Sequence, residues 1–443
     1  MFPNPQDALP LPLRPNLEQY KKLAKDLLNA CKSGESQAIR AWADTWVHTL
    51  VRLSNLTITP ELPVRIERWI DQLDEFARKK LKPSGANACV LSEAQFVIAR
   101  AHGFESWPRF AKHIEGLART SSPVMKFELA ADAIVSGDTA TLERLLRENS
   151  DLIRARSTRE HRATLLHYVS ANGVEGYRQK TPKNAARIAE MLIEFGAEVD
   201  AEADVYGGGA TTLGLVATSV HPERAGVQEE LMQVLLDHGA MIDRPGVARN
   251  RHDAVAGCLA NGPGKAAEFL ANHGARLGLD TAAGVGRLDL VNSFFHDDKS
   301  LKGSATRAQM EQGFLWACQY GRTAVVESLL EKGAGLLNRA DNEQTALHCA
   351  VIGAHLDIIE VLLARGASLE RKNVYGGTAL GQALWSAING DAGSDYVPII
   401  ETLIDAGAEI EKGSLAWLAR QGGGSLATKE RIVEVLRQRG ATS

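Results

Sequence analysis

Residues 362–367 read Leu-Leu-Ala-Arg-Gly-Ala, and this pattern of paired apolar residues, a short polar stretch and Gly-Ala returns along most of the chain. The paired apolar residues would face a neighbouring helix, while the glycine takes the left-handed conformation that ends a helix. The glycines stand 43, 35, 59, 33, 41 and 33 residues apart, and this spacing predicts a stack of similar helical units with insertions. The seven copies end at Gly196, Gly239, Gly274, Gly333, Gly366, Gly407 and Gly440.

A second motif precedes this ending. Residues 164–167 read Thr-Leu-Leu-His and residues 345–348 read Thr-Ala-Leu-His. Together the two motifs resemble the ankyrin repeat, in which a first helix opens T-P-L-H and a second helix ends L-L-x-x-G-A. The resemblance covers roughly residues 127–441. It implies about nine units, of which the first, at 127–146, and the fifth, at 280–295, are degenerate.

The predicted fold class is therefore all-α. An ankyrin-repeat solenoid of about nine repeats takes residues 126–443, and a small helical domain takes residues 1–125. We expect this domain to cover the open end of the solenoid, because terminal repeats need a polar cap. Residues 94–114 resemble a stretch found ahead of repeats in some bacterial ankyrin-repeat proteins, which implies a bacterial origin. The domain should hold five helices, at roughly 16–32, 36–53, 60–82, 92–102 and 107–118.

Charge is divided unevenly along the chain. Through Lys126 there are 18 Lys and Arg against 13 Asp and Glu, and the remainder has 32 against 41, so the parts carry about +5 and −9. The basic run at 78–82 and the helix pair at 92–118 leave a DNA-binding interpretation open. Basic residues at a helix C-terminus also complement the helix dipole, and we favour that explanation. Nucleic acid is not the expected partner.

Several classes of protein are disfavoured by composition. The longest apolar runs are well short of the roughly 18 residues a membrane span needs, and the N-terminus lacks the basic and apolar stretches of a signal peptide. The five cysteines are scattered and none has metal-ligand spacing, so no metal or cofactor is expected. Scattered cysteines in odd number favour a reducing cytoplasm.

The first helices of ankyrin repeats line a concave groove. The residue after the motif histidine and the two before the next glycine share one helix face and should point into it. These positions are rich in aromatic and uncharged side chains, which suits a protein-binding surface or a pocket for an apolar ring. The tryptophans could equally be large core residues. The predicted groove residues are Tyr168, Asn172, Trp316, Gln319, Tyr320, Gln382, Trp385, Trp417 and Arg420.

Three repeats carry extra residues between their two helices, at 172–183, 218–227 and 387–396. One long loop would mean little, but three at the same place suggest a rim around a site. Two repeats are also preceded by Val-Tyr-Gly-Gly, at 205–208 and 374–377. The predicted rim residues are Tyr177, Arg178, Tyr206, Arg224 and Tyr375.

In the repeats that follow Val-Tyr-Gly-Gly, glycine replaces the motif histidine, at Gly214 and Gly381. In the ankyrin family that histidine ties the helix start to the adjoining turn, so its loss removes hydrogen bonds and opens space. Either the neighbouring long loops fill the space, which we favour, or it forms a ligand pocket.

Catalytic motifs are not evident. No phosphate loop, His-Glu-x-x-His or Gly-x-Ser-x-Gly occurs. The weak candidates for acid-base chemistry are His221, Asp391, Asp395 and Tyr396. The leading hypothesis is a binding module that recognises a partner protein or peptide through the groove and rim. The alternative is an enzyme or binder of a small apolar or aromatic ligand, with the groove closed by the long loops and the N-terminal domain.

Overall fold

The computed structural model describes residues 4–54, 62–81, 89–243, 253–336, 340, 342–390 and 393–441. The chain divides into two compact units. The first unit comprises residues 1–257 and 261–266, and the second comprises residues 258–260 and 267–443. The N-terminal helical region therefore lies in the same compact unit as the first repeats.

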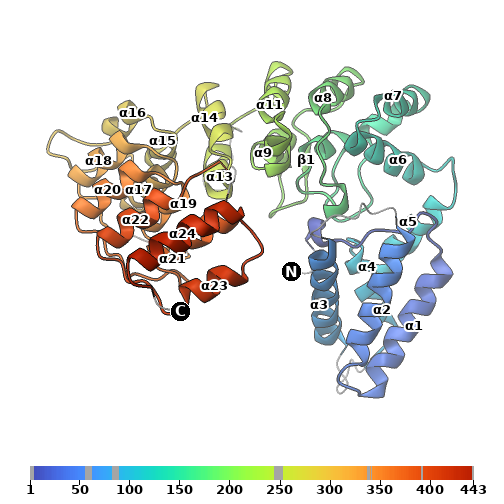
Figure 1. Ribbon diagram of the computed structural model, residues 1–443. Coiled ribbons are helices and arrows are strands. Elements are labelled where there is room, and N and C mark those ends of the chain that lie inside the picture. The colour runs from blue at the N-terminus through green and yellow to red at the C-terminus, as the bar shows by residue number, and fades with distance from the viewer. Residues whose placement is uncertain are drawn as a thin grey trace. The chain divides into compact units, whose positions relative to one another are not determined.

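The N-terminal region contains the five expected helices, within a few residues of the predicted bounds (Figure 1). Their apolar faces enclose one core that includes Trp69, Leu73 and Phe110. A short 3-10 helix, η1 (Pro5–Asp7), precedes them. The five helices are α1 (Leu17–Ser33), α2 (Ala38–Leu53), α3 (Leu62–Lys80), α4 (Leu91–Ala101) and α5 (Trp107–Leu117).

Three helix pairs follow in the first unit. Short elements occupy the connections: η2 (Ser150–Arg154), η4 (Gly176–Arg178) and α10 (Val220–Ala225). The sole sheet among the described residues is a two-stranded antiparallel hairpin of β1 (Glu202–Ala203) and β2 (Ala210–Thr211). The pairs are α6 (Pro123–Ser136) with α7 (Thr139–Glu148), η3 (Leu165–Ser170) with α8 (Ala185–Glu194), and α9 (Thr212–Ala217) with α11 (Gln228–Asp237).

Six more pairs complete the repeats along the described chain, which confirms the predicted helical fold and the count of about nine. The degenerate fifth unit is present as a shortened pair. The pairs are α13 (Ala254–Asn261) with α14 (Gly264–Asn272), α15 (Leu279–Gly284) with α16 (Leu288–Ser293), α17 (Arg307–Gln319) with α18 (Thr323–Glu331), α19 (Ala346–Ile352) with α20 (Leu356–Ala364), α21 (Ala379–Asn389) with α22 (Val397–Asp405), and α23 (Ser414–Arg420) with α24 (Leu426–Gln438).

The two sequence motifs perform the structural roles expected of them. The Gly-Ala glycines all have positive φ, for example +80° at Gly366. The backbone N–H of Thr345 donates to His348 Nδ1 at 3.3 Å, and His348 Nε2 donates to the Gly377 carbonyl at 3.0 Å. The histidine thus joins the start of its helix to the next finger. We use "finger" for the segment between the second helix of one repeat and the first helix of the next.

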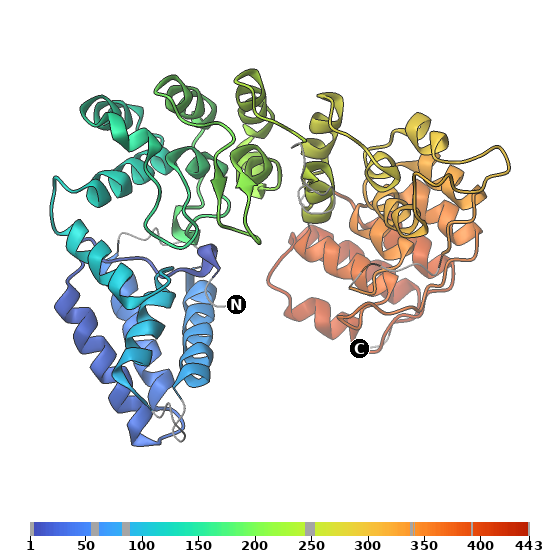
Figure 2. The ribbon, with the colours of Figure 1, turned by 180° about the vertical axis from the view of Figure 1, so that it is seen from behind.

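The helical region is attached to the first finger. Glu160 N–H donates to the Gly103 carbonyl at 2.9 Å, Arg100 pairs with Glu160, and His113 Nδ1 lies 2.7 Å from Thr158 Oγ1. Figures 1 and 2 show the five helices next to the first repeats of this unit, with α5 adjoining α6.

The expected cover over the end of the first repeat is not complete. Leu129 on α6 remains 44% exposed. The helical region packs against α6 through α5, and it is also attached to the first finger and to the connection between η3 and α8.

Candidate functional site

The most exposed large apolar side chains of the second unit include three on one finger and the helix that follows it. Val374 and Tyr375, at the finger tip, are 56% and 81% exposed, and Trp385 on α21 is 51% exposed. Asn373 holds the finger in shape, because its Oδ1 accepts hydrogen bonds from the N–H groups of Tyr375 and Gly377, both at 3.0 Å. We call Val374, Tyr375 and Trp385 the Tyr375 surface.

The finger of the first unit shares Val-Tyr-Gly-Gly, and its Tyr206 is 62% exposed but hydrogen-bonded within the chain. The Tyr206 hydroxyl donates to Asn172 Oδ1 at 2.7 Å and lies 3.3 Å from Gln6 Oε1. Asn172 Nδ2 in turn donates to Thr218 Oγ1 at 3.2 Å. The predicted rim residue Tyr206 and groove residue Asn172 therefore lie together, although their polar atoms are used within the chain.

Gly214 and Gly381 leave room at the helix starts, as predicted. A Cβ on either would meet only the hydroxyl of its own capping threonine, at 3.5 Å for Gly214 and 3.6 Å for Gly381. Each glycine N–H donates to that threonine, Thr211 or Thr378. The cap therefore survives the loss of histidine.

The predicted rim position of Arg178 is wrong, because its side chain is buried in a cluster of charges. Arg178 and Arg159 sandwich the Glu128 carboxylate with Nη1–Oε distances of 2.7 Å each. Arg159 also pairs with Glu175 at 2.9 Å, and Glu175 is fully buried. The half-buried Tyr177 accepts a hydrogen bond from Arg159 Nη2 at 3.2 Å. The connection 172–183 is therefore folded inward in this part and does not form a solvated rim.

Tyr168 is also displaced from its predicted role as a groove residue. Its side chain is 0% exposed and its ring lies edge-on to Phe127, with centroids 6.0 Å apart. Tyr168 follows the motif histidine, as the groove pattern requires, but the inward-folded connection covers its side of the helix. The Arg178 guanidinium of that connection lies 5.9 Å from the centroid of the Tyr168 ring.

The buried charges have shifted pKa values. Burial raises the pKa of Glu128, but Arg159 and Arg178 outweigh burial and lower it to about 2. The same two arginines hold the pKa of Glu175 well below its usual range despite complete burial. Both carboxylates are therefore ionised and paired, so the cluster acts as a structural link. A carboxyl at an acid-base site would need a pKa nearer neutrality.

The remaining groove positions are half-buried or exposed. Trp316, Gln319, Tyr320, Gln382 and Trp417 are half-buried, and Arg420 is exposed. The Tyr320 hydroxyl donates to the Leu259 carbonyl at 2.5 Å, and Trp417 packs against the core of the second unit. Both aromatic side chains therefore contribute to the packing of the repeats.

Among the described residues, the weak catalytic candidates do not form one catalytic site. Tyr396 is buried and donates to the Ile352 carbonyl at 3.0 Å. Asp395 accepts a hydrogen bond from Arg431 that lowers its pKa and makes it a poorer base. His221 lies in the first unit near the exposed Arg224; burial first, and then Arg224 and Arg65, lower its pKa. Asp391 lies outside the described residues.

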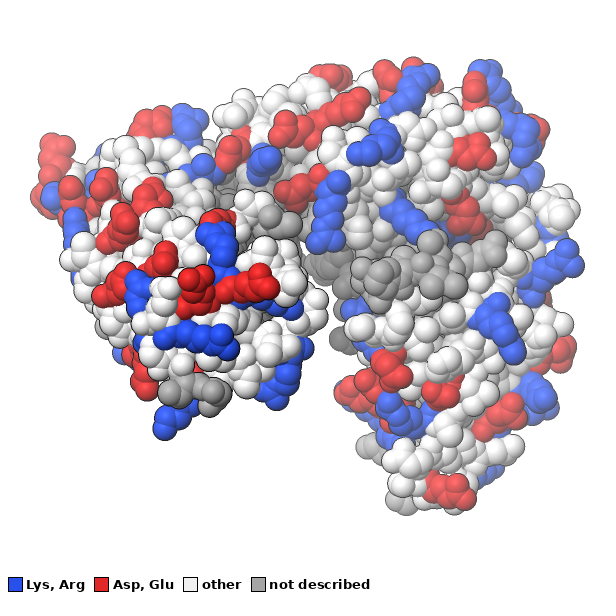
Figure 3. All heavy atoms as spheres, in the orientation of Figure 1, with Lys and Arg blue, Asp and Glu red and all other residues white. Residues whose placement is uncertain are grey.

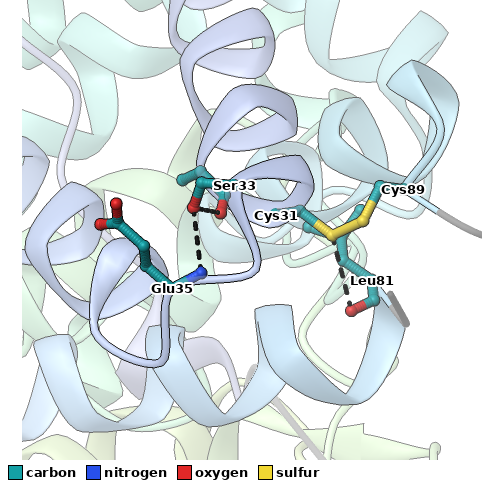
Figure 4. Close-up of a disulfide and its surroundings, with 6 residues drawn as sticks. Cys31, Ser33, Glu35, Leu81 and Cys89 are labelled. Atoms are coloured by element: carbon teal, nitrogen blue, oxygen red, sulfur yellow. Dashed lines mark hydrogen bonds between the residues drawn. A yellow bond between two sulfur atoms is a disulfide. The ribbon is translucent and has the colours of Figure 1, made fainter. Parts of the chain in front are cut away.

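One feature was not foreseen from the sequence. Cys31, at the end of α1, forms a disulfide with Cys89, just before α4 (Figure 4). Both half-cystines are buried, and the Cys31 sulfur faces the Leu81 carbonyl at 3.8 Å. Cys258, Cys318 and Cys349 are buried. Disulfides persist mainly in oxidising compartments, so this bond argues against the cytoplasmic prediction.

The described surface carries mixed charge. Figure 3 shows basic and acidic side chains interspersed over the visible face of each unit. The described residues contain no cluster of three or more His, Cys, Asp or Glu side chains placed to hold a metal ion. No described helix is both long enough and apolar enough to span a bilayer.

Comparison with known proteins identifies the repeats. A family model described as "Ankyrin repeats (3 copies)" matches residues 279–373 and 314–414, so these residues of the second unit contain ankyrin repeats. Among solved structures, the human ASB11 ankyrin repeat domain is similar at 21% sequence identity, over 64% of this chain and 99% of that chain, with a TM-score of 0.33. No curated protein matches this chain.

Proposed function

We propose that this protein is a binding module whose second unit recognises a partner protein or peptide through its groove and fingers. Ankyrin repeats generally mediate protein–protein interactions, and residues 279–414 match them. The single observation that carries the proposal is the exposure of Val374 and Tyr375 on one finger and of Trp385 on the helix that follows it. Large aromatic side chains left in solvent cost free energy unless a partner covers them, and such residues dominate binding energy at protein interfaces.

The proposal is tested by substituting an exposed anchor. Trp385→Ala should weaken partner binding by about 2 kcal/mol or more, the scale of an interface hot spot. The measurement is retention of proteins from the source cell on the immobilised full chain, followed by titration of the retained partner. Leu426→Ala is a matched control, because Leu426 is an exposed apolar residue of the second unit outside the Tyr375 surface.

The enzyme alternative makes the opposite prediction. Loss of a general acid or base costs about 10²–10⁴ in rate, while ligand affinity changes little. A turnover that collapses in His221→Ala or Asp395→Asn, in a folded protein, would therefore replace the binding proposal. A partner whose affinity is equal for the wild type and Trp385→Ala would contradict it.

The proposal also includes the source of the protein and its compartment. The resemblance of residues 94–114 supports a bacterial origin. The buried thiols of Cys318 and Cys349 are compatible with the cytoplasm, and the Cys31–Cys89 bond is the observation against it. Thiol titration of the protein isolated from its native cell would decide between the compartments.

A further inference from the structure

The first finger begins differently from the later ones. No Gly-Ala pair follows α7, and the chain instead continues through Asn149 into the 3-10 helix η2. Asn149 Nδ2 donates to the Leu145 carbonyl at 2.9 Å, which holds the end of α7 without a glycine. The extra turn of η2 ends with the buried Ile153 and the exposed Arg154. Both residues border a pocket that also involves the second finger.

This pocket lies entirely within the first unit. Its volume is about 350 Å³, which is at the lower end of the range for small-molecule sites. Gly196, which ends the second repeat, contributes open space, because a Cβ there would meet no atom within 4 Å. The pocket is lined by Ile153, Arg154, Arg156 and Thr164 of the first finger and by Gly196 and Glu198 of the second.

Three charged side chains of the pocket keep unused hydrogen-bonding capacity. Arg156 Nη1 donates to the carbonyls of Arg162 at 3.0 Å and Glu202 at 2.5 Å, and these bonds fix the guanidinium in place. Its Nε and Nη2 have no acceptor among the described residues. Arg154 and Glu198 are exposed, and within the described chain neither forms an ion pair or a side-chain hydrogen bond. The pocket therefore presents two guanidinium groups and one carboxylate that do not pair with one another.

We propose that this pocket binds a small zwitterion, namely an α-amino acid with an aliphatic side chain. Guanidinium groups match the geometry of a carboxylate, so Arg154 and Arg156 receive the carboxylate of the ligand. Glu198 accepts hydrogen bonds from its ammonium group, and Ile153 supplies an apolar wall for the side chain. A ligand with only one of the two charges would leave part of the site unpaired. This site is separate from the Tyr375 surface and does not depend on the proposed function.

The test compares L-leucine with two molecules that each lack one of its charges. Isocaproate keeps the carboxylate and the branched chain of leucine but has no ammonium group. Isoamylamine keeps the ammonium group and the branched chain but has no carboxylate. Isothermal titration calorimetry on the full chain should show saturable binding of L-leucine, and each of the other two molecules should bind about tenfold more weakly or less, because one charge-assisted contact is lost.

Two substitutions assign each ligand charge to its residue. Arg154→Gln should weaken the binding of L-leucine about tenfold and should not weaken that of isoamylamine, which has no carboxylate to lose. Glu198→Gln should weaken the binding of L-leucine by a similar factor and should not weaken that of isocaproate. Arg307→Gln and Glu311→Gln are matched controls, because these residues form an exposed pair in the second unit, and both should leave binding unchanged. Circular dichroism and thermal melting verify that each variant is folded.

Three results would overturn the inference. Isocaproate that binds as tightly as L-leucine would show that the pocket takes a simple anion. Binding of L-leucine that is unchanged in both Arg154→Gln and Glu198→Gln would place the amino acid elsewhere on the protein. The absence of saturable L-leucine binding would reject the ligand class. In each case Trp385-dependent capture of a partner protein would be unaffected, so failure of this inference is distinguishable from failure of the proposed function.

Discussion

Gly366 illustrates how single residues determine where the helices end. Its φ is +80°, and a Cβ added there would meet no atom within 4 Å. The requirement for glycine is therefore conformational and not steric. A left-handed backbone costs roughly 1–2 kcal/mol for any other L-residue, and the same requirement returns at each Gly-Ala ending.

Gly366→Ala should therefore lower the free energy of unfolding by about 1 kcal/mol. Gly303→Ala is the matched control, since Gly303 also has open space around its α-carbon but no positive φ. It should be neutral or slightly stabilising. Urea denaturation of both variants provides the measurement, and equal midpoints would show that the left-handed cap contributes nothing.

At this scale the sequence predicted much of the structure. The glycine endings and the threonine–histidine boxes depend only on local geometry, so a repeated motif reveals them. The positions of Tyr168 and Arg178 could not be predicted in the same way. Tyr168, the residue after the motif histidine, is exposed or buried according to how the 12-residue connection at 172–183 folds. Arg178 of that connection joins Glu128 and Arg159, which come from distant parts of the chain.

Among the elements, the connection between η3 and α8 has the most unusual role. It places Glu175 and Arg178 against Glu128 from α6 and Arg159 from the first finger. Buried ion pairs are stable only when every charge keeps its partner. The stability of the connection and that of α6 therefore depend on each other, although the sequence suggested three equivalent exposed loops.

Glu128→Gln tests this dependence. It would leave two buried guanidinium groups with one fewer carboxylate, and should destabilise the protein by about 3–5 kcal/mol. Glu148→Gln breaks the exposed pair between Glu148 and Arg144 and should change stability little. If the two variants unfold at the same urea concentration, the cluster is not a structural link.

At the scale of the whole molecule, buried histidines make the stability of the first unit depend on pH. Burial lowers the pKa of His102 to about 3, and that of His113 and His167 to about 4. The unfolded chain takes up these protons below about pH 6.5, whereas the folded chain resists them. The stabilisation is thus complete above about pH 6.5 and is lost as the pH falls through the folded pKa values.

We expect the urea midpoint to fall as the pH is lowered from about 6.5 toward 4, with up to about 1.4 kcal/mol per pH unit from each histidine. Glu128 adds a further loss only at lower pH, because its carboxylate stabilises the fold above about pH 4.5 and protonates near 2. His113→Gln should flatten the slope relative to His48→Gln, which changes an exposed histidine. A midpoint that is constant over this range would contradict the assignment.

The contact of Gln6 with Tyr206 spans 200 residues and has a consequence for synthesis. A ribosome adds about 5–20 residues per second, so Gln6 is made roughly 10–40 s before the tyrosine that it contacts. During that time the five helices can assemble around their own core, which includes Leu9 of this segment, while Gln6 still lacks its contact with Tyr206. The contact between Gln6 and Tyr206 can therefore form only after this finger has been made.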